Sequence, residues 1–165
     1  MSTNPDPVEW SREQWVAHKQ PAPDQFTAMV AILRTHQAMC SSIDSTLRTH
    51  DLTRTGYLLM TTLLLSRDGT RPLGQLSKQL MVHPTTVTLA LDQLEKRKLL
   101  KRKPHPTDRR TILATLTPAG RELLDKVTKA LSDTDYGLTG VSNKLSNKVV
   151  DVLRDVRGHI GDIPA

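Results

Sequence analysis

Apolar residues recur along most of the chain at the spacing of helical faces. After residue 24, two interleaved series repeat every seven positions, which is typical of a long helix packed against other helices: Phe26, Leu33, Cys40 and Leu47, and Met29, His36 and Ile43. Asp24 is the expected N-cap of this helix. A second helix is expected from Thr53 to the sequence Arg67-Asp68-Gly69. Its apolar residues lie on nearly all sides, so we expect it to be buried: Tyr57, Leu58, Met60, Leu63, Leu64 and Leu65.

The middle of the chain combines two short helices with two strand-like runs. The first helix carries apolar residues at Leu73, Leu76 and Leu80, and a bend over residues 81–83 leads to a second helix that starts at Pro84. The second helix turns Val87, Leu91 and Leu94 towards the core. Two short helices joined by a tight turn predict a helix-turn-helix. Residues 99–103 and 111–116 are strand-like and flank a proline-rich segment, which predicts a hairpin, or wing.

Helical patterns return after the hairpin and also precede the long helix. Thr117 followed by Pro118 is a strong start signal for a helix. A last helix is expected near Ser146, with Leu145 before the cap and Val150 inside. A short helix over residues 8–19 lies between proline pairs and is expected to pack on the main body.

These elements predict a mainly α fold with a small β-hairpin wing. We expect residues 1–23 to form an N-terminal extension and residues 52–116 a winged helix-turn-helix DNA-binding domain. Residues 24–51 and 117–163 are expected to form the helical region that joins two copies of the chain.

Charge and composition restrict the function. Residues 71–110 hold ten Lys and Arg against three Asp and Glu, a net +7, while the whole chain carries +6. A basic block of this kind is the electrostatic footprint of a nucleic-acid partner, and a solvated charged face is the alternative. A single cysteine, Cys40, excludes a disulfide framework and any Cys-x-x-Cys site. No catalytic or cofactor-binding motif is found, so neither an enzyme nor a bound cofactor is predicted. No membrane span or signal pattern is found either, so we expect a cytoplasmic protein.

The outward face of the helix that starts at Pro84 supplies the candidates for reading bases. Hydroxyl groups can form hydrogen bonds with base edges, and methyl groups can contact thymine. The candidates on this face, near the start of the helix, are His83, Thr85, Thr86, Thr88, Leu89 and Asp92. Phosphate contacts are expected from the basic residues that follow: Lys96, Arg97, Lys98, Lys101, Arg102 and Lys103. The wing tip carries Asp108, Arg109 and Arg110, where an arginine can enter the minor groove.

These segments together resemble the MarR family of bacterial regulators. The resemblance rests on four stretches in this order: residues 76–82, Pro84-Thr85-Thr86-Val87-Thr88 with Leu94-Glu95, Asp108-Arg109-Arg110, and Leu116-Thr117-Pro118-Ala119-Gly120. It implies a homodimer that binds a double-stranded DNA operator and represses transcription until a small amphipathic or phenolic effector binds. It places Arg110 in the minor groove, directed by Asp108. It also implies an effector pocket where the dimer helices meet the DNA-binding lobe, with His36, Cys40, Tyr57 and Met60 as candidate lining residues.

Two positions depart from the family pattern. Lys98 stands where the family usually has glycine in a left-handed backbone, and Leu89 stands where many relatives carry arginine. Two alternative functions remain at this point. One is an architectural DNA-binding protein without a ligand. The other is a metal-sensing or redox-sensing regulator that uses His36 and Cys40, which lie four residues apart on one helical face.

Overall fold

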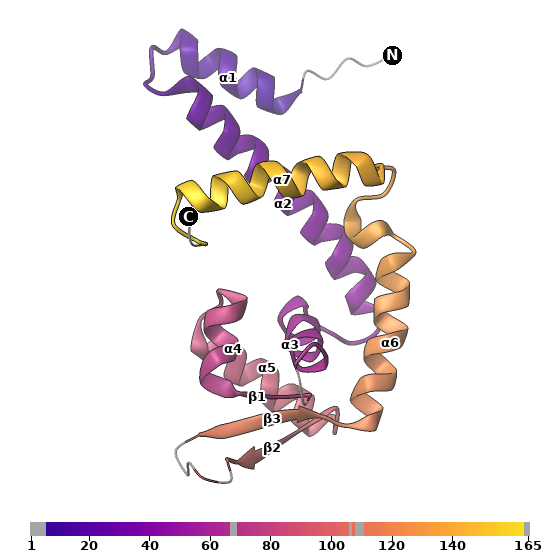
Figure 1. Ribbon diagram of the computed structural model, residues 1–165. Coiled ribbons are helices and arrows are strands. Elements are labelled where there is room, and N and C mark those ends of the chain that lie inside the picture. Colours follow the sequence, from indigo (N-terminus) through magenta and orange to yellow (C-terminus); the bar gives the residue numbers. More distant parts are fainter. Residues whose placement is uncertain (1–5, 67–68, 106, 108–110, 164–165) are drawn as a thin grey trace.

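A computed structural model of the chain describes residues 6–66, 69–105, 107 and 111–163. These residues form seven α-helices, one short 3-10 helix and three strands (Figure 1): α1 (Pro7–Ala17), α2 (Pro23–Arg48), α3 (Arg54–Leu64), β1 (Thr70–Pro72), α4 (Leu73–Leu80), α5 (Pro84–Lys96), β2 (Leu100–Pro104), β3 (Ile112–Leu116), α6 (Pro118–Ser132), η1 (Asp135–Gly137) and α7 (Asn143–His159). The predicted mainly α fold with a wing hairpin is confirmed. Within the described ranges, no helix is long and apolar enough to cross a bilayer.

The elements divide between a compact lobe and an elongated helical region (Figure 1). Helices α3, α4 and α5 and the sheet form the lobe, while α2 and α6 rise from it and α7 follows η1 beyond the end of α6. Helix α1 lies at the far end of α2, where Trp15 stacks on Phe26 with ring centroids 3.8 Å apart. The N-terminal helix therefore packs on the beginning of α2 and not on the lobe.

The wing belongs to a three-stranded antiparallel sheet in the order β1-β3-β2. Strands β2 and β3 lie within one residue of the two predicted runs. Strand β1 was not predicted, because a three-residue segment has too short a pattern to be recognised. It is identified only by its partner, since Thr70 pairs with Thr115 and the two hydroxyl oxygens lie 2.8 Å apart.

The core of the lobe lies between α3, α5 and the sheet. Leu76 and the predicted inward residues of α5, Val87, Leu91 and Leu94, are all buried. The expectation that α3 is buried on nearly all sides is wrong. Tyr57, Met60 and Leu63 are buried, whereas the remaining three apolar residues are exposed: Leu58, Leu64 and Leu65. One side of α3 therefore faces away from its own core.

Two predicted helix starts are wrong for local reasons. Helix α2 begins at Pro23, which supplies the fixed φ of a first helical position, so Asp24 lies inside the first turn. The Asp24 carboxylate is 2.6 Å from Nη1 of Arg12. Helix α7 begins at Asn143 and not near Ser146, because the Ser142 hydroxyl accepts a hydrogen bond from the Leu145 amide and caps the helix earlier.

Candidate nucleic-acid interface

Helices α4 and α5 meet in the tight turn expected of a helix-turn-helix. Met81, at the end of α4, has a left-handed backbone with φ of 52°, which redirects the chain. His83 then caps α5, because its Nδ1 accepts a hydrogen bond from the Thr85 amide at 3.3 Å. Since the opposite face of α5 is buried against the core, the cap and the turn fix which side of the helix faces solvent.

All six predicted readout residues of this segment are exposed: His83, Thr85, Thr86, Thr88, Leu89 and Asp92. Residues at helical spacings of three and four lie on one face, so Thr85, Leu89 and Asp92 form a stripe along α5. Leu89 exposes 58% of its surface. The Thr88 hydroxyl donates a hydrogen bond to the Pro84 carbonyl at 3.1 Å. The uncovered face of α5 is therefore available to a large partner.

Arg102 joins the wing to this helix. Its Nη2 lies 2.7 Å from Oδ1 of Asp92 and 2.5 Å from Oε2 of Glu95. Its Nε also donates to Glu95 Oε2 at 2.7 Å, and its amide donates to Glu95 Oε1 at 3.1 Å. The hydrogen bond from Arg102 lowers the pKa of Glu95, and the same bond raises the pKa of Arg102. The guanidinium that was predicted to meet phosphate is thus held by two carboxylates of α5.

The four lysines that were predicted to contact phosphate are all exposed: Lys96, Lys98, Lys101 and Lys103. Lys98 has the left-handed backbone that the sequence indicated, with φ of 60°. Its amide donates to the Glu95 carbonyl at 2.8 Å, and the next amide, of Leu99, donates to the Leu94 carbonyl at 2.9 Å. A non-glycine residue in this conformation costs about 1 kcal/mol.

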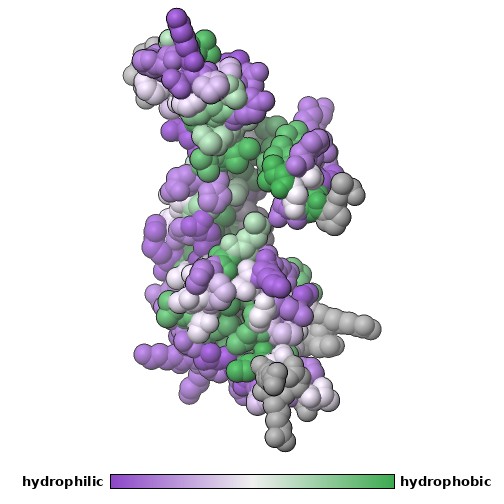
Figure 2. Space-filling view, turned by 90° about the vertical axis from the view of Figure 1, so that its left-hand side faces the viewer, coloured by the Kyte–Doolittle hydropathy of each residue, from purple (hydrophilic) through white to green (hydrophobic). Residues whose placement is uncertain are grey.

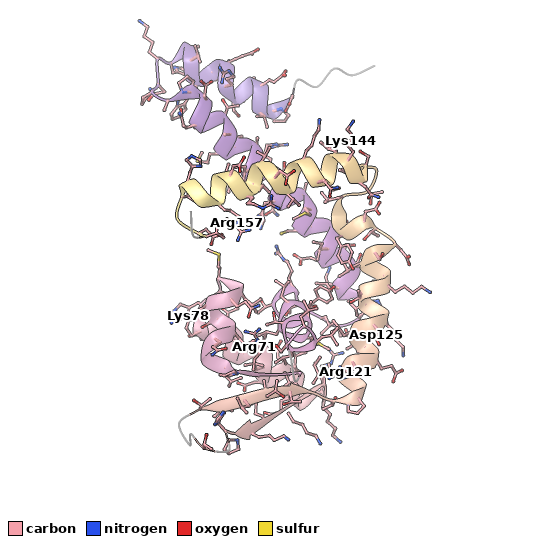
Figure 3. All side chains as sticks on the ribbon, viewed as in Figure 1. Arg71, Lys78, Arg121, Asp125, Lys144 and Arg157 are labelled. Atoms are coloured by element: carbon pink, nitrogen blue, oxygen red, sulfur yellow. The ribbon has the colours of Figure 1, made fainter. Side chains whose placement is uncertain are left out.

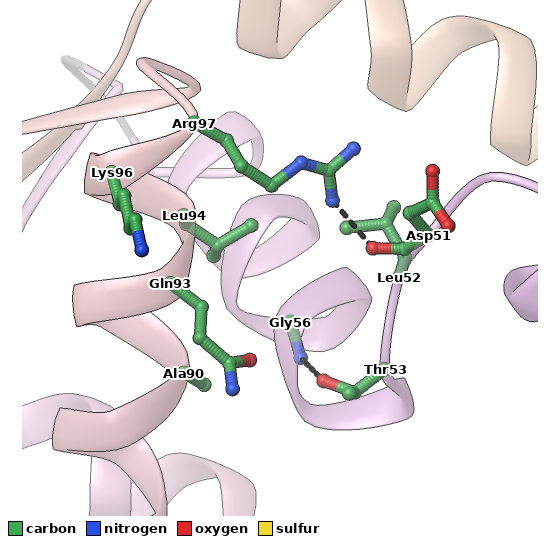
Figure 4. A pocket seen from close by; sticks show the side chains of 9 residues that line it. All are labelled: Asp51, Leu52, Thr53, Gly56, Ala90, Gln93, Leu94, Lys96 and Arg97. Atoms are coloured by element: carbon green, nitrogen blue, oxygen red, sulfur yellow. Dashed lines mark hydrogen bonds between the residues drawn. The ribbon is translucent and has the colours of Figure 1, made fainter.

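Arg97 has an intramolecular partner that the sequence did not reveal. Its guanidinium donates to the backbone carbonyl of Asp51, 46 residues earlier in the chain (Figure 4). It also donates to the carbonyl of His50. These carbonyls lie in the turn that follows α2, and Asp51 lines a cavity of about 250 Å³ between α3 and α5. Such a link between distant segments leaves no local pattern, so Arg97 could not be separated from its basic neighbours by sequence alone.

The junction between the wing and α6 is built on a close approach of two backbones. The Thr117 hydroxyl donates to the Lys98 carbonyl at 2.8 Å and accepts from the Gly120 amide at 3.0 Å. The Thr117 amide donates to the Leu99 carbonyl at 3.1 Å. A Cβ on Gly120 would lie 2.0 Å from that same carbonyl oxygen, so only glycine fits. The predicted wing-tip residues Asp108, Arg109 and Arg110 lie outside the described residues.

A cleft of about 810 Å³ lies where α2, α3 and η1 meet. Three of the four predicted pocket residues line it: His36, Cys40 and Tyr57. The fourth, Met60, is completely buried in the core and does not line the cleft.

The chemistry of the cleft mixes aromatic and charged groups. Nε2 of His36 lies 3.3 Å from Sγ of Cys40. Arg54, which also lines the cleft, forms two hydrogen bonds with the Asp44 carboxylate at 3.0 and 3.1 Å. Burial and the neighbouring Tyr57 raise the pKa of Tyr136. Among the described residues, no group of three or more His, Cys, Asp or Glu side chains is placed to hold a metal ion.

Helix α7 carries a large apolar surface with no cover from its own chain. None of its residues is buried, and its exposed apolar residues are Leu145, Val149, Val150, Val152, Leu153 and Val156. The first half of α2 adds three more: Met29, Ile32 and Leu33. Figure 2 shows apolar residues gathered in this upper part of the molecule, on α7 and on α2. Lys144 lies near the start of α7 and Arg157 near its end (Figure 3).

Helix α5 is capped, has an uncovered face, and lies between a tight turn and a basic hairpin. This combination defines a winged helix-turn-helix DNA-binding protein. Comparison with known proteins narrows this class. The MarR family model matches residues 52–112. The HTH-type transcriptional regulator YhbI of Bacillus subtilis is 33% identical over 118 residues, which cover 72% of this chain and 73% of YhbI.

Solved structures agree. Sco5413, a MarR family transcriptional regulator from Streptomyces coelicolor, is 30% identical, with a TM-score of 0.78 over 86% of this chain and 99% of that one. BpsR of Bordetella bronchiseptica, whose DNA binding is regulated by 6-hydroxynicotinic acid, is 26% identical, with a TM-score of 0.67 over 76% of this chain and 89% of that one. The chain belongs to the MarR family and is a DNA-binding transcriptional regulator.

Proposed function

We propose that the protein binds a pseudo-palindromic operator as a homodimer and represses transcription until a small amphipathic ligand releases it. The observation that carries this proposal is the uncovered face of α5, flanked by exposed lysines and fixed by the His83 cap. A helix presented in this way fits the major groove, and two copies related by a two-fold axis would read half-sites about one helical turn apart.

The apolar surface of α7 and α2 supports the dimer. In proteins, most of the stability of a helix comes from packing of an apolar face and not from its own propensity. Helix α7 has 17 residues, and none of them is buried by its own chain. A second copy supplies a matching surface, because a two-fold interface pairs the same patch on both subunits. Light scattering on the purified protein should therefore give twice the mass of the chain.

The residues around α5 divide into two roles in this proposal. His83, Thr85, Thr86, Thr88 and Leu89 face base edges, and Lys96, Lys98 and Lys101 meet phosphates. For the wing tip, the family pattern places Arg110 in the minor groove and uses Asp108 to direct it, and Arg109 is a further candidate for DNA contact.

The cleft supports a small-molecule effector. It lies between α2, which carries part of the apolar dimer surface, and α3, which packs against α5 inside the lobe. A ligand seated there would contact both parts and could favour an arrangement of the two lobes that does not fit DNA. BpsR is regulated by 6-hydroxynicotinic acid, a hydroxylated aromatic acid, so this compound is a sensible first probe.

A gel-shift series with the DNA upstream of the protein's own gene tests the proposal. At physiological salt we expect a complex that scrambled DNA of equal length does not displace. Thr86→Ala should weaken only the cognate complex. Equal losses on all DNA would instead favour an architectural DNA-binding protein.

Phosphate contacts are tested by salt dependence. Lys101→Ala should reduce the slope of log affinity against log salt by about one unit. Lys126→Ala is the matched control, because Lys126 lies on α6 and pairs with Glu122 at 2.7 Å. Equal slopes for Lys101→Ala and the unchanged protein would remove Lys101 from the interface.

A further inference from the structure

Three of the polar side chains on the outward side of α5, those of His83, Thr88 and Asp92, form contacts within the protein. The Thr88 hydroxyl donates to the Pro84 carbonyl at 3.1 Å, and His83 Nδ1 accepts from the Thr85 amide at 3.3 Å. The Asp92 carboxylate lies 2.7 Å from the Arg102 guanidinium. The proton of the Thr88 hydroxyl and the charge of Asp92 are therefore already engaged within the protein, so a bond from either of them to a base adds less free energy than a bond from an unengaged group.

The same surface exposes apolar groups. Leu89 lies at the centre of the outward stripe with 58% of its surface accessible, one helical turn after Thr85. Because the Thr88 hydroxyl is turned to the backbone, the methyl group of Thr88 remains free to face outwards. From Thr85 to Leu89 no residue carries a charge, an amide or a guanidinium. The bidentate pairs that select guanine or adenine need such groups, so this stretch of five residues cannot form them.

We propose that α5 selects its operator mainly by apolar contact of Leu89 and the Thr88 methyl group with the C5-methyl groups of thymines in the major groove. The major groove presents a methyl group only at thymine, so an apolar contact there distinguishes A·T from G·C pairs and one strand from the other. The proposal rests on the proposed function, because it assumes that α5 lies in the major groove.

The operator is first obtained by selection. The full-length protein is mixed with a pool of duplexes that have a randomised centre, and bound duplexes are recovered and amplified over several rounds. The enriched duplex is then made again with deoxyuridine in place of thymidine, one half-site position at a time. Uracil keeps the base pair and lacks only the methyl group.

We expect one or two positions in each half-site where uracil weakens binding about fourfold, the value of burying one methyl-sized group. For Leu89→Ala, uracil at the position that Leu89 contacts should have no effect. Thr88→Val keeps the methyl group and should keep the sensitivity to uracil, whereas Thr88→Ser should lose it. Both sites are exposed, so these variants should fold, and their circular dichroism should match that of the unchanged protein.

The outcomes separate the two proposals. If no sequence is enriched from the pool, specific DNA recognition fails and the thymine contact fails with it. If a sequence is enriched and uracil has no effect at any position, the protein recognises an operator but not through thymine methyl groups. If uracil weakens binding equally in the unchanged protein, Leu89→Ala and Thr88→Ser, the methyl groups act through DNA shape and the proposed contact is overturned.

Discussion

Gly120→Ala should destabilise the protein far more than an ordinary glycine substitution. The new Cβ would lie 2.0 Å from the Leu99 carbonyl oxygen and 3.0 Å from its carbon, so the two backbones must separate by more than an ångström. That carbonyl accepts a hydrogen bond from the Thr117 amide at 3.1 Å, and it shares the proton of the Thr117 hydroxyl, 3.1 Å away, with the closer Lys98 carbonyl at 2.8 Å. Separation also strains the cap of α6, in which Thr117 accepts from the Gly120 amide.

The expected size follows from these contacts. The Thr117 amide bond, the shared hydroxyl bond and the weakened N-cap contribute up to about 1 kcal/mol each, so the free energy of unfolding should fall by about 2 to 3 kcal/mol. Urea unfolding followed by circular dichroism, at one fixed protein concentration, measures this difference.

Gly74→Ala is the matched control. Gly74 lies in α4 with no neighbouring atom within 4 Å of the position that an added methyl group would take, and its backbone is not left-handed. Alanine there should change the free energy of unfolding by less than about 1 kcal/mol, in the stabilising direction. If Gly120→Ala behaved like Gly74→Ala, the close approach to Leu99 would not exist in the folded protein.

Three further predictions concern other parts of the molecule. Lys98→Gly should raise the free energy of unfolding by about 1 kcal/mol, because glycine adopts the left-handed backbone without strain. Lys98→Ala is the control, since it removes the same charge without this gain. Equal urea midpoints for the two variants would show that the backbone at residue 98 is not strained. Because Arg102 lowers the pKa of Glu95 in the folded state, the ion pair stabilises the protein above the usual pKa of a glutamate, and this stability is lost as the pH falls through the lowered pKa. The difference in unfolding free energy between the unchanged protein and Glu95→Gln should therefore shrink in acid, and a difference that grew would refute the assignment. Leu153→Glu should place a charge in the apolar surface of α7, so light scattering should give the mass of a monomer. If this variant still has the mass of a dimer, α7 does not form the interface.

Local signals allowed much of the fold to be predicted. The Thr117-Pro118 start of α6 and the inward positions of α5 depend on residues within a turn or two of each other, and both were confirmed. The start of α7 was missed because Ser142 and Ser146 are both possible caps, and in the structure it is the Ser142 hydroxyl that accepts a hydrogen bond from the Leu145 amide. Strand β1 was missed because it is defined by pairing with β3, 45 residues away at Thr70 and Thr115.

The candidate site was predictable in position but not in its internal contacts. The outward face of α5 follows from helical periodicity, since its buried residues repeat at three and four positions. In contrast, a basic residue in a charged run looks the same whether it meets solvent or another part of the chain. Arg97 bonds carbonyls in the turn that follows α2, and Arg102 bonds two carboxylates, and neither contact leaves a trace in the local sequence.

The exposed Leu89 also has a consequence for temperature. Contacts that bury apolar groups weaken on cooling, because hydrophobic burial is driven by entropy near room temperature. Discrimination by leucine and methyl contacts should then be sharper in warm than in cold solution, and formation of the specific complex should show a negative heat-capacity change. A regulator with 58% of Leu89 open to solvent would in this way distinguish its operator from other DNA least well in the cold.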